Sequence, residues 1–165
     1  MASGRRSAGI VVFRRAAGPD GGLEVLLGHM GGPFWAHRDA GAWSVVKGEV
    51  EAGEEDEAAA RREFTEELGL PVPDGPLVPL GEVRQSGGKV VAAWAVEADL
   101  DPAGAVFGTF TMEWPRGSGT LREFPELDRI AWLPLAAARE KVVAGQRPLL
   151  DRLAEARPTP PRGRR

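Results

Sequence analysis

The stretch that decides the fold is Gly48–Leu70, which reads GEVEAGEEDEAAARREFTEELGL. Its part from Glu54 to Leu68 is rich in Glu, Ala and Arg and contains neither Gly nor Pro, so it predicts a helix. Gly69 and Pro71 follow directly and end that helix, because Gly favours a left-handed cap and Pro cannot continue the hydrogen-bond ladder.

The predicted helix has two different faces. Side chains three and four residues apart project from the same side of a helix, which places three carboxylates together. These are Glu63, Glu66 and Glu67. An apolar stripe lies roughly 110° away around the helix axis and is expected to pack on the core. It consists of Ala60, Phe64 and Leu68.

The three neighbouring carboxylates allow two interpretations. Like charges at this spacing repel one another and raise each other's pKa unless a cation compensates them. A solvated helix face neutralised by Arg61 and Arg62 would do so, and so would a hard divalent ion with oxygen ligands, such as Mg²⁺ or Mn²⁺.

The order of the other residues favours the metal site, because the whole stretch resembles the Nudix box. That pattern is Gly, five residues, Glu, seven residues, and then Arg-Glu-apolar-any-Glu-Glu-any-Gly-apolar. The matching residues are Gly48, Glu54, Arg62, Glu63, Phe64, Glu66, Glu67, Gly69 and Leu70.

This resemblance implies a fold, a set of roles and a reaction. The fold is the Nudix α/β/α sandwich with a mixed β-sheet, in which the box forms a loop-helix-loop. Metal binding is implied for Glu63, Glu66, Glu67 and the backbone carbonyl of Lys47. Arg62 would orient a box carboxylate through a salt bridge, and Glu54 would support the metal ligands without binding the metal itself. The reaction is hydrolysis of a phosphoanhydride bond with Mg²⁺ or Mn²⁺, which neutralise phosphate oxygens and activate water.

The flanking segments predict strands and closing helices that agree with this fold. Strands are expected over 7–15, 23–27, 42–46, 80–85, 89–98, 106–114 and 129–133, with a loop over 31–41 and helices over 135–143 and 148–156.

Two segments outside the helix suggest the substrate. Trp43–Gly48 resembles the Trp-x-x-Pro-Lys-Gly motif of the dinucleoside polyphosphate hydrolase and RNA pyrophosphohydrolase branch, with Val46 in place of Pro. Lys89–Trp94 and Glu126–Leu133 resemble the same branch. We therefore expect a small nucleotide substrate such as diadenosine tetraphosphate. Oxidised nucleoside triphosphates, RNA 5′ ends and a non-catalytic nucleotide-binding module are the alternatives.

Several residues are candidates for contact with that substrate. Lys47 and Lys89 are expected to bind phosphate, although Lys47 also fits a surface lysine. Phe34, Trp35 and Trp114 could stack on a nucleobase or pack as a loop cover. His29 and His37 are expected to be hydrogen-bonded loop residues.

A further carboxylate is needed from the wall opposite the helix, either as a metal ligand or as a base. The resemblance places a functional Glu at Glu126, which Pro125 precedes. Glu113 and Glu123 are rival candidates.

The composition of the 165-residue chain predicts a single Nudix hydrolase domain over 1–156 and a disordered basic tail over 157–165. No apolar run approaches the length of a membrane span, and no apolar segment of a secretory signal follows Met1–Ser7, so a cytoplasmic monomer or homodimer is expected. The absence of cysteine excludes disulfides and thiolate metal sites. The net charge of −3 makes nucleic acid an unlikely partner.

Overall fold

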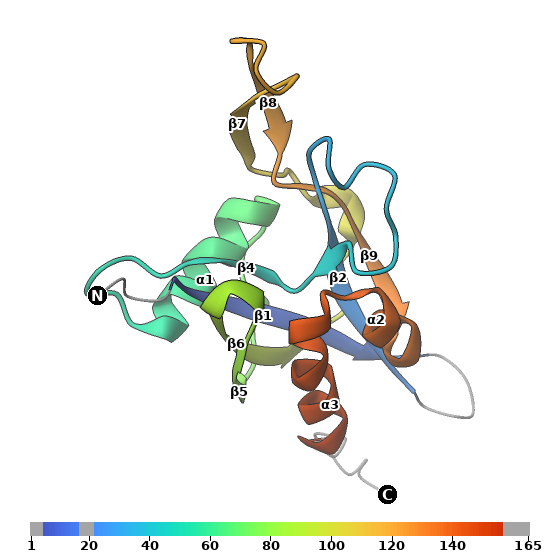
Figure 1. Cartoon of the computed structure of the whole chain (residues 1–165). Coiled ribbons are helices and arrows are strands. Elements are labelled where there is room, and N and C mark those ends of the chain that lie inside the picture. Colours follow the sequence, from blue (N-terminus) through green and yellow to red (C-terminus); the bar gives the residue numbers. More distant parts are fainter. Residues whose placement is uncertain (1–4, 17–21, 157–165) are drawn as a thin grey trace, which may run out of the picture.

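The computed structural model describes residues 5–16 and 22–156. Its main sheet contains seven strands, and a separate pair of strands forms a hairpin (Figure 1). The main-sheet strands are β1 (Arg6–Arg15), β2 (Leu23–Met30), β3 (Trp43–Ser44), β4 (Val46–Glu49), β5 (Val78–Arg84), β6 (Val90–Glu97) and β9 (Leu127–Pro134). The hairpin strands are β7 (Thr109–Glu113) and β8 (Leu121–Pro125).

Strand β1 lies at the centre of the mixed sheet. It pairs with β6 in parallel, and with β2 and β4 in antiparallel orientation. Strand β9 pairs with the other edge of β2, and β5 pairs with β6. The consecutive strands β1 and β2, and likewise β5 and β6, therefore form antiparallel hairpins.

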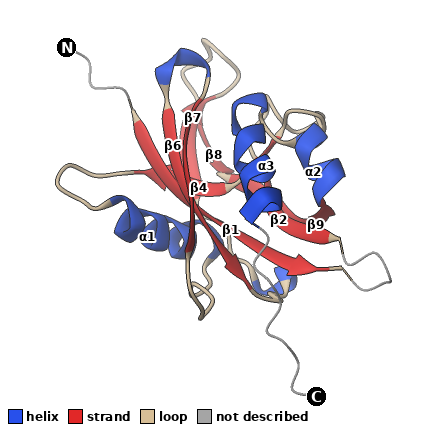
Figure 2. Cartoon of the chain, turned by 90° about the horizontal axis from the view of Figure 1, so that it is seen from below, coloured by secondary structure: helices blue, strands red, loops and turns tan. Residues whose placement is uncertain are grey.

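Helices cover both faces of this sheet (Figure 2). Alternate residues of β1 point to opposite sides, because side chains alternate along a strand. Ile10 and Val12 join the core beneath α1 (Asp56–Leu68), whereas Val11 and Phe13 join the core beneath the closing helices. These are α2 (Leu135–Lys141) and α3 (Arg147–Ala156). The predicted α/β/α sandwich is thus confirmed.

Helix α1 buries the stripe that the sequence predicts, since Ala60, Phe64 and Leu68 are each fully buried. Gly69 ends the helix with φ of 64°, in the left-handed region. The helix begins at Asp56, two residues after the expected start, because Glu54 belongs to a turn in which its N–H donates to the Glu51 carbonyl.

The structure corrects some strand boundaries. The segment expected as one strand over 42–46 is interrupted at Val45, whose N–H donates to the Gln146 side chain at 2.9 Å. The strand expected over 106–114 starts only at Thr109, because the N–H groups of Val106 and Gly108 bond to the end of α1. The sequence did not predict β8, whose charged residues lack an apolar alternation.

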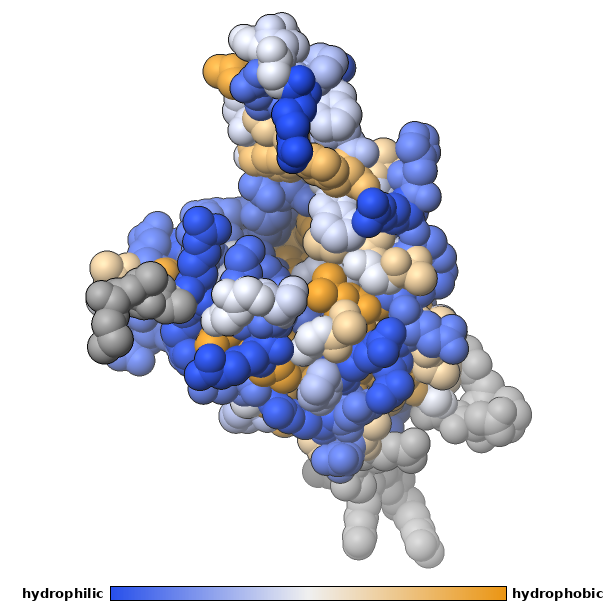
Figure 3. All heavy atoms as spheres, viewed as in Figure 1, coloured by the Kyte–Doolittle hydropathy of each residue, from blue (hydrophilic) through white to orange (hydrophobic). Residues whose placement is uncertain are grey.

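The β7–β8 hairpin projects from the body of the molecule (Figures 1 and 3). None of the helices in the described part of the chain is long and apolar enough to span a bilayer. The tail predicted over 157–165 lies outside the described residues.

Candidate active site

One cavity of about 520 Å³ brings most of the predicted site residues together. This volume lies within the range of small-molecule sites, about 300 to 1,000 Å³. Figure 3 shows the hollowed surface between the body and the hairpin. The charged residues lining the cavity are Arg5, Lys47, Glu49, Glu63, Glu67, Lys89 and Glu126, and its aromatic residues are Trp35 and Phe110.

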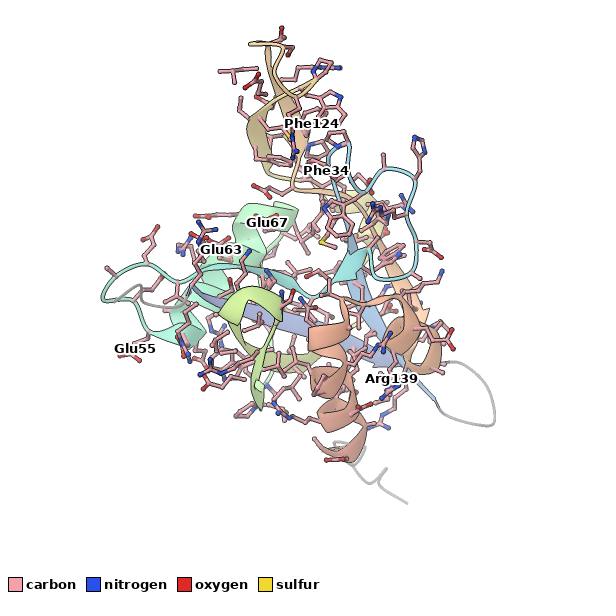
Figure 4. The ribbon with its side chains drawn as sticks, viewed as in Figure 1. Phe34, Glu55, Glu63, Glu67, Phe124 and Arg139 are labelled. Atoms are coloured by element: carbon pink, nitrogen blue, oxygen red, sulfur yellow. The ribbon has the colours of Figure 1, made fainter. Side chains whose placement is uncertain are left out.

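Four carboxylates from three parts of the chain line this cavity. Helix α1 contributes Glu63 and Glu67 (Figure 4), and β4 contributes Glu49. Glu126 comes from the junction between β8 and β9. The rivals Glu113 and Glu123 are not among the lining residues, and the Glu113 carboxylate accepts a hydrogen bond from Gly119 N–H in the hairpin turn.

Arg62 organises the carboxylates behind the cavity. Its guanidinium donates to both oxygens of Glu54 at 2.8 and 2.9 Å, to Glu63 at 2.8 Å and to Glu66 at 3.0 Å. It also donates to the backbone carbonyl of Glu49 at 3.0 Å. One planar, permanently charged group therefore fixes the box loop to the helix. Glu66 shares Arg62 Nη1 with Glu63, but unlike Glu63 and Glu67 it is not among the residues that line the cavity.

Gly48 allows the helix carboxylate to approach the β4 backbone. A Cβ atom at this position would lie 1.8 Å from Glu63 Oε2, far inside van der Waals contact. The backbone of Gly48 is not in the left-handed region. The glycine is thus required by the close approach of Glu63 and not by backbone conformation.

The cavity holds its carboxylates in an unfavourable electrostatic environment. Desolvation and the neighbouring charges of Glu126 and Glu63 raise the pKa of Glu67 to about 7. Desolvation also raises the pKa of Glu63 and of Glu126. In contrast, hydrogen bonds from Arg62 lower the pKa of Glu54 to about 2. Burial therefore disfavours the ionised form of the cavity carboxylates, whereas Arg62 favours the ionised form of Glu54.

The donor set fits a divalent oxygen-binding ion. Hard cations of this kind prefer carboxylates and carbonyls, and a bound positive charge would offset the desolvation that raises the pKa of these carboxylates. Within residues 5–16 and 22–156, no three acidic or histidine side chains already converge on a single point. Coordination would therefore require small side-chain adjustments, including release of carboxylate oxygens from Arg62.

Basic and aromatic side chains complete the lining. Burial and the neighbouring charge of Lys89 lower the pKa of the Lys47 ammonium. The carboxylates of Glu67, Glu49 and Glu126 act in the other direction and limit this lowering. Trp35 lines the cavity as well, whereas Phe34 lies against Trp114 of the hairpin and outside the lining.

The two histidines lie outside the cavity lining. His29 is fully buried and bonds the Asp128 carboxylate and the Arg38 carbonyl. His37 is exposed.

Three residues that line the cavity were not predicted from the sequence, namely Glu49, Arg5 and Phe110. Glu49 reaches the cavity because β4 extends past Gly48 and pairs with β1, where Ser7 faces Glu49. Predicting Glu49 as a cavity residue requires the register in which β4 pairs with β1. The β4 sequence VKGE has no alternating hydrophobic pattern from which this register could be inferred.

Comparisons with known proteins agree with this geometry. A family model described as the NUDIX domain matches residues 4–153. The chain belongs to the NUDIX family. A search of the curated proteins found no match.

Solved structures share the NUDIX fold over nearly the whole chain. A C. elegans Ap4A hydrolase in a binary complex is 21% identical with a TM-score of 0.63, covering 91% of this chain and 96% of that one. The MutT protein of Methanosarcina mazei Go1 is 16% identical with a TM-score of 0.62, covering 94% and 97%. The NUDIX domain of Shewanella oneidensis NrtR complexed with ADP ribose is 16% identical with a TM-score of 0.60, covering 94% and 90%.

Family membership and the intact box together support the pyrophosphohydrolase that the sequence predicts. This NUDIX chain is accordingly an enzyme of the hydrolase class.

The raised pKa of Glu67 predicts how stability depends on pH without metal. A carboxyl group that binds protons more tightly when folded stabilises the protein below its unfolded pKa, near 4.5, and loses that contribution as pH rises through about 7. In EDTA, the melting temperature of the wild type relative to Glu67→Gln should therefore fall by roughly 5 °C between pH 5 and pH 8. Thermal melts of both proteins measure this difference, and Mg²⁺ should restore the loss at pH 8. A difference that does not change with pH would contradict the electrostatic description of the cavity.

Proposed function

We propose that this NUDIX enzyme hydrolyses a phosphoanhydride bond in a nucleoside diphosphate linked to another group, most specifically in a dinucleoside polyphosphate such as diadenosine tetraphosphate. The supporting observation is the cavity itself, in which four carboxylates share one space with Lys47 and Lys89. Such a space suits a polyphosphate, because carboxylates hold divalent ions and the ammonium groups bind phosphate oxygens.

The metal ligands in this proposal are Glu63, Glu67 and the Lys47 carbonyl, joined by Glu126 from the junction between β8 and β9. Glu66 joins them when its carboxylate leaves Arg62. Bound Mg²⁺ or Mn²⁺ would neutralise the phosphate oxygens and lower the pKa of an attacking water. Arg62 positions Glu63 and the box loop through the hydrogen bonds described above.

Glu67 and Glu126 are the candidates to take the proton from the attacking water. Both line the cavity, and the negative charge of Glu126 adds to desolvation in raising the pKa of Glu67 to about 7. A base that ionises near neutral pH is well matched to proton transfer at that pH. Glu126, which the junction between β8 and β9 supplies, can act on a water bound beside the helix carboxylates.

Three observations support the choice of a dinucleoside polyphosphate as substrate. Trp43–Gly48 and Glu126–Leu133 resemble the dinucleoside polyphosphate branch, and one residue of each segment, Lys47 and Glu126, lines the same cavity. The C. elegans structure, an Ap4A hydrolase, also shares the fold. The acidic net charge favours a small nucleotide over RNA.

We further propose that the protein acts in the cytoplasm.

A substrate panel tests this assignment. Diadenosine tetraphosphate should be cut with a higher kcat/KM than any nucleoside triphosphate, with Mg²⁺ or Mn²⁺ present. The panel should include oxidised triphosphates, ADP-ribose and triphosphorylated RNA, with products separated by chromatography. A tenfold or greater preference for one of these other substrates would overturn the dinucleoside assignment and leave the hydrolase class intact.

A further inference from the structure

The β7–β8 hairpin carries aromatic and basic side chains that no fold requirement explains. The Phe34 ring meets the Trp114 ring edge to face, with centroids 5.6 Å apart. The Arg116 guanidinium lies 5.8 Å from the centre of the Phe34 ring. Phe34 remains 47% exposed, so these groups form a surface feature and not part of either core.

This aromatic cluster, consisting of Phe34, Trp114 and Arg116, belongs to two segments that also supply residues to the cavity lining. Phe34 belongs to the segment that also supplies Gly31 and Trp35 to the cavity lining. Trp114 and Arg116 belong to the β7–β8 hairpin, and Phe110 near the base of this hairpin also lines the cavity. Phe110 also contacts Phe124 across the hairpin, and Figure 4 shows Phe34 and Phe124 together at this end of the molecule.

Backbone hydrogen bonds tie the base of the hairpin to the acidic wall. Gly108 N–H donates to the Glu67 carbonyl, and its own carbonyl accepts from Glu126 N–H at 2.8 Å. The Glu126 carbonyl in turn accepts from Gly31 N–H at 2.9 Å. These bonds hold the base of the hairpin and the start of the Phe34 segment against Glu67 and Glu126, so the two segments that carry the cluster are anchored beside these carboxylates.

We infer that the aromatic cluster binds the second nucleoside of the substrate, outside the cavity that holds its polyphosphate. This inference rests on the proposed function. A cavity of about 520 Å³ can hold a polyphosphate with one nucleoside, and a second nucleoside must leave at the mouth. Exposed aromatic faces stack on any base, and a nearby guanidinium adds attraction for the base and for adjacent phosphate oxygens. The hairpin thereby selects dinucleotides over mononucleotides.

The test compares two substrates that share the same polyphosphate, diadenosine tetraphosphate and adenosine tetraphosphate. Phe34→Ala and Trp114→Ala should each lower kcat/KM for the dinucleotide by roughly tenfold, mainly through KM, because a stacking contact is lost. Neither should change kcat/KM for adenosine tetraphosphate by more than about twofold. Leu121→Ala is the matched control, since Leu121 is 71% exposed on the same hairpin and is not part of the cluster. Equal losses on both substrates, or no loss on either, would overturn the inference.

A binding measurement separates this inference from the proposed reaction. In EDTA, where no turnover is expected, calorimetric titration should show weaker binding of diadenosine tetraphosphate to Phe34→Ala than to wild type. Binding of adenosine tetraphosphate should be equal for the two proteins. If wild type hydrolyses neither nucleotide but shows this difference, the proposed reaction fails and the subsite stands. Equal binding of the dinucleotide by both proteins overturns the subsite whatever the reaction.

Discussion

Replacing Glu67 by Gln should lower kcat by at least about 10²-fold at saturating Mg²⁺, because the variant loses a carboxylate that we assign to the metal and the water. In EDTA at pH 8, the same variant should melt at a higher temperature than the wild type. The reason is that Glu67 is partly desolvated and repelled by Glu63 and Glu126, and its neutral form avoids that cost.

Opposite changes in activity and stability distinguish this effect from simple unfolding. Glu57→Gln is the matched control, because Glu57 lies on the same helix, half exposed, and pairs only loosely with Arg61 at 3.8 Å. It should keep both kcat and melting temperature close to wild type. Undiminished turnover of Glu67→Gln would remove this residue from the mechanism.

Gly48→Ala should reduce kcat by about 10²-fold or more while the protein stays folded. The new methyl group would overlap the Glu63 carboxylate, 1.8 Å from its Oε2 atom, so that carboxylate must swing away from its place. The clash involves the end of a flexible side chain, which limits the effect on folding. Circular dichroism melts and steady-state kinetics measure the two effects separately.

Gly22→Ala serves as the control for the glycine substitution. A methyl group added at Gly22 would meet no atom within 4 Å, and the backbone there is outside the left-handed region, so this variant should behave as wild type. Wild-type kcat for Gly48→Ala would show that the Glu63 carboxylate need not occupy the position seen in the structure.

The sequence was sufficient to predict the features that depend on local periodicity. The spacing of Ala60, Phe64 and Leu68 predicted the buried side of α1, and Gly69 predicted its end. The central strands were predicted because buried β-branched runs such as Ile10–Val12 leave few alternatives. These patterns lie within one segment, so the chain alone contains them.

Features that depend on tertiary pairing were harder to predict. Strand β8 is exposed along most of its length and has charged residues, so it lacks the alternation that marks a strand. Helical spacing placed Glu66 with Glu63 and Glu67, but it did not show that Glu66 bonds Arg62 without lining the cavity. Glu49 and Arg5 reach the cavity only through the pairing of β4 and β6 with β1.

Hydrolysis of diadenosine tetraphosphate in ¹⁸O-labelled water tests the central claim most directly, with products analysed by mass spectrometry. Mg²⁺ should support cleavage with one labelled oxygen entering a nucleotide product for each bond broken, and EDTA should abolish this cleavage. Cleavage that persists in EDTA, or products that contain no label, would contradict metal-dependent attack by water in this cavity.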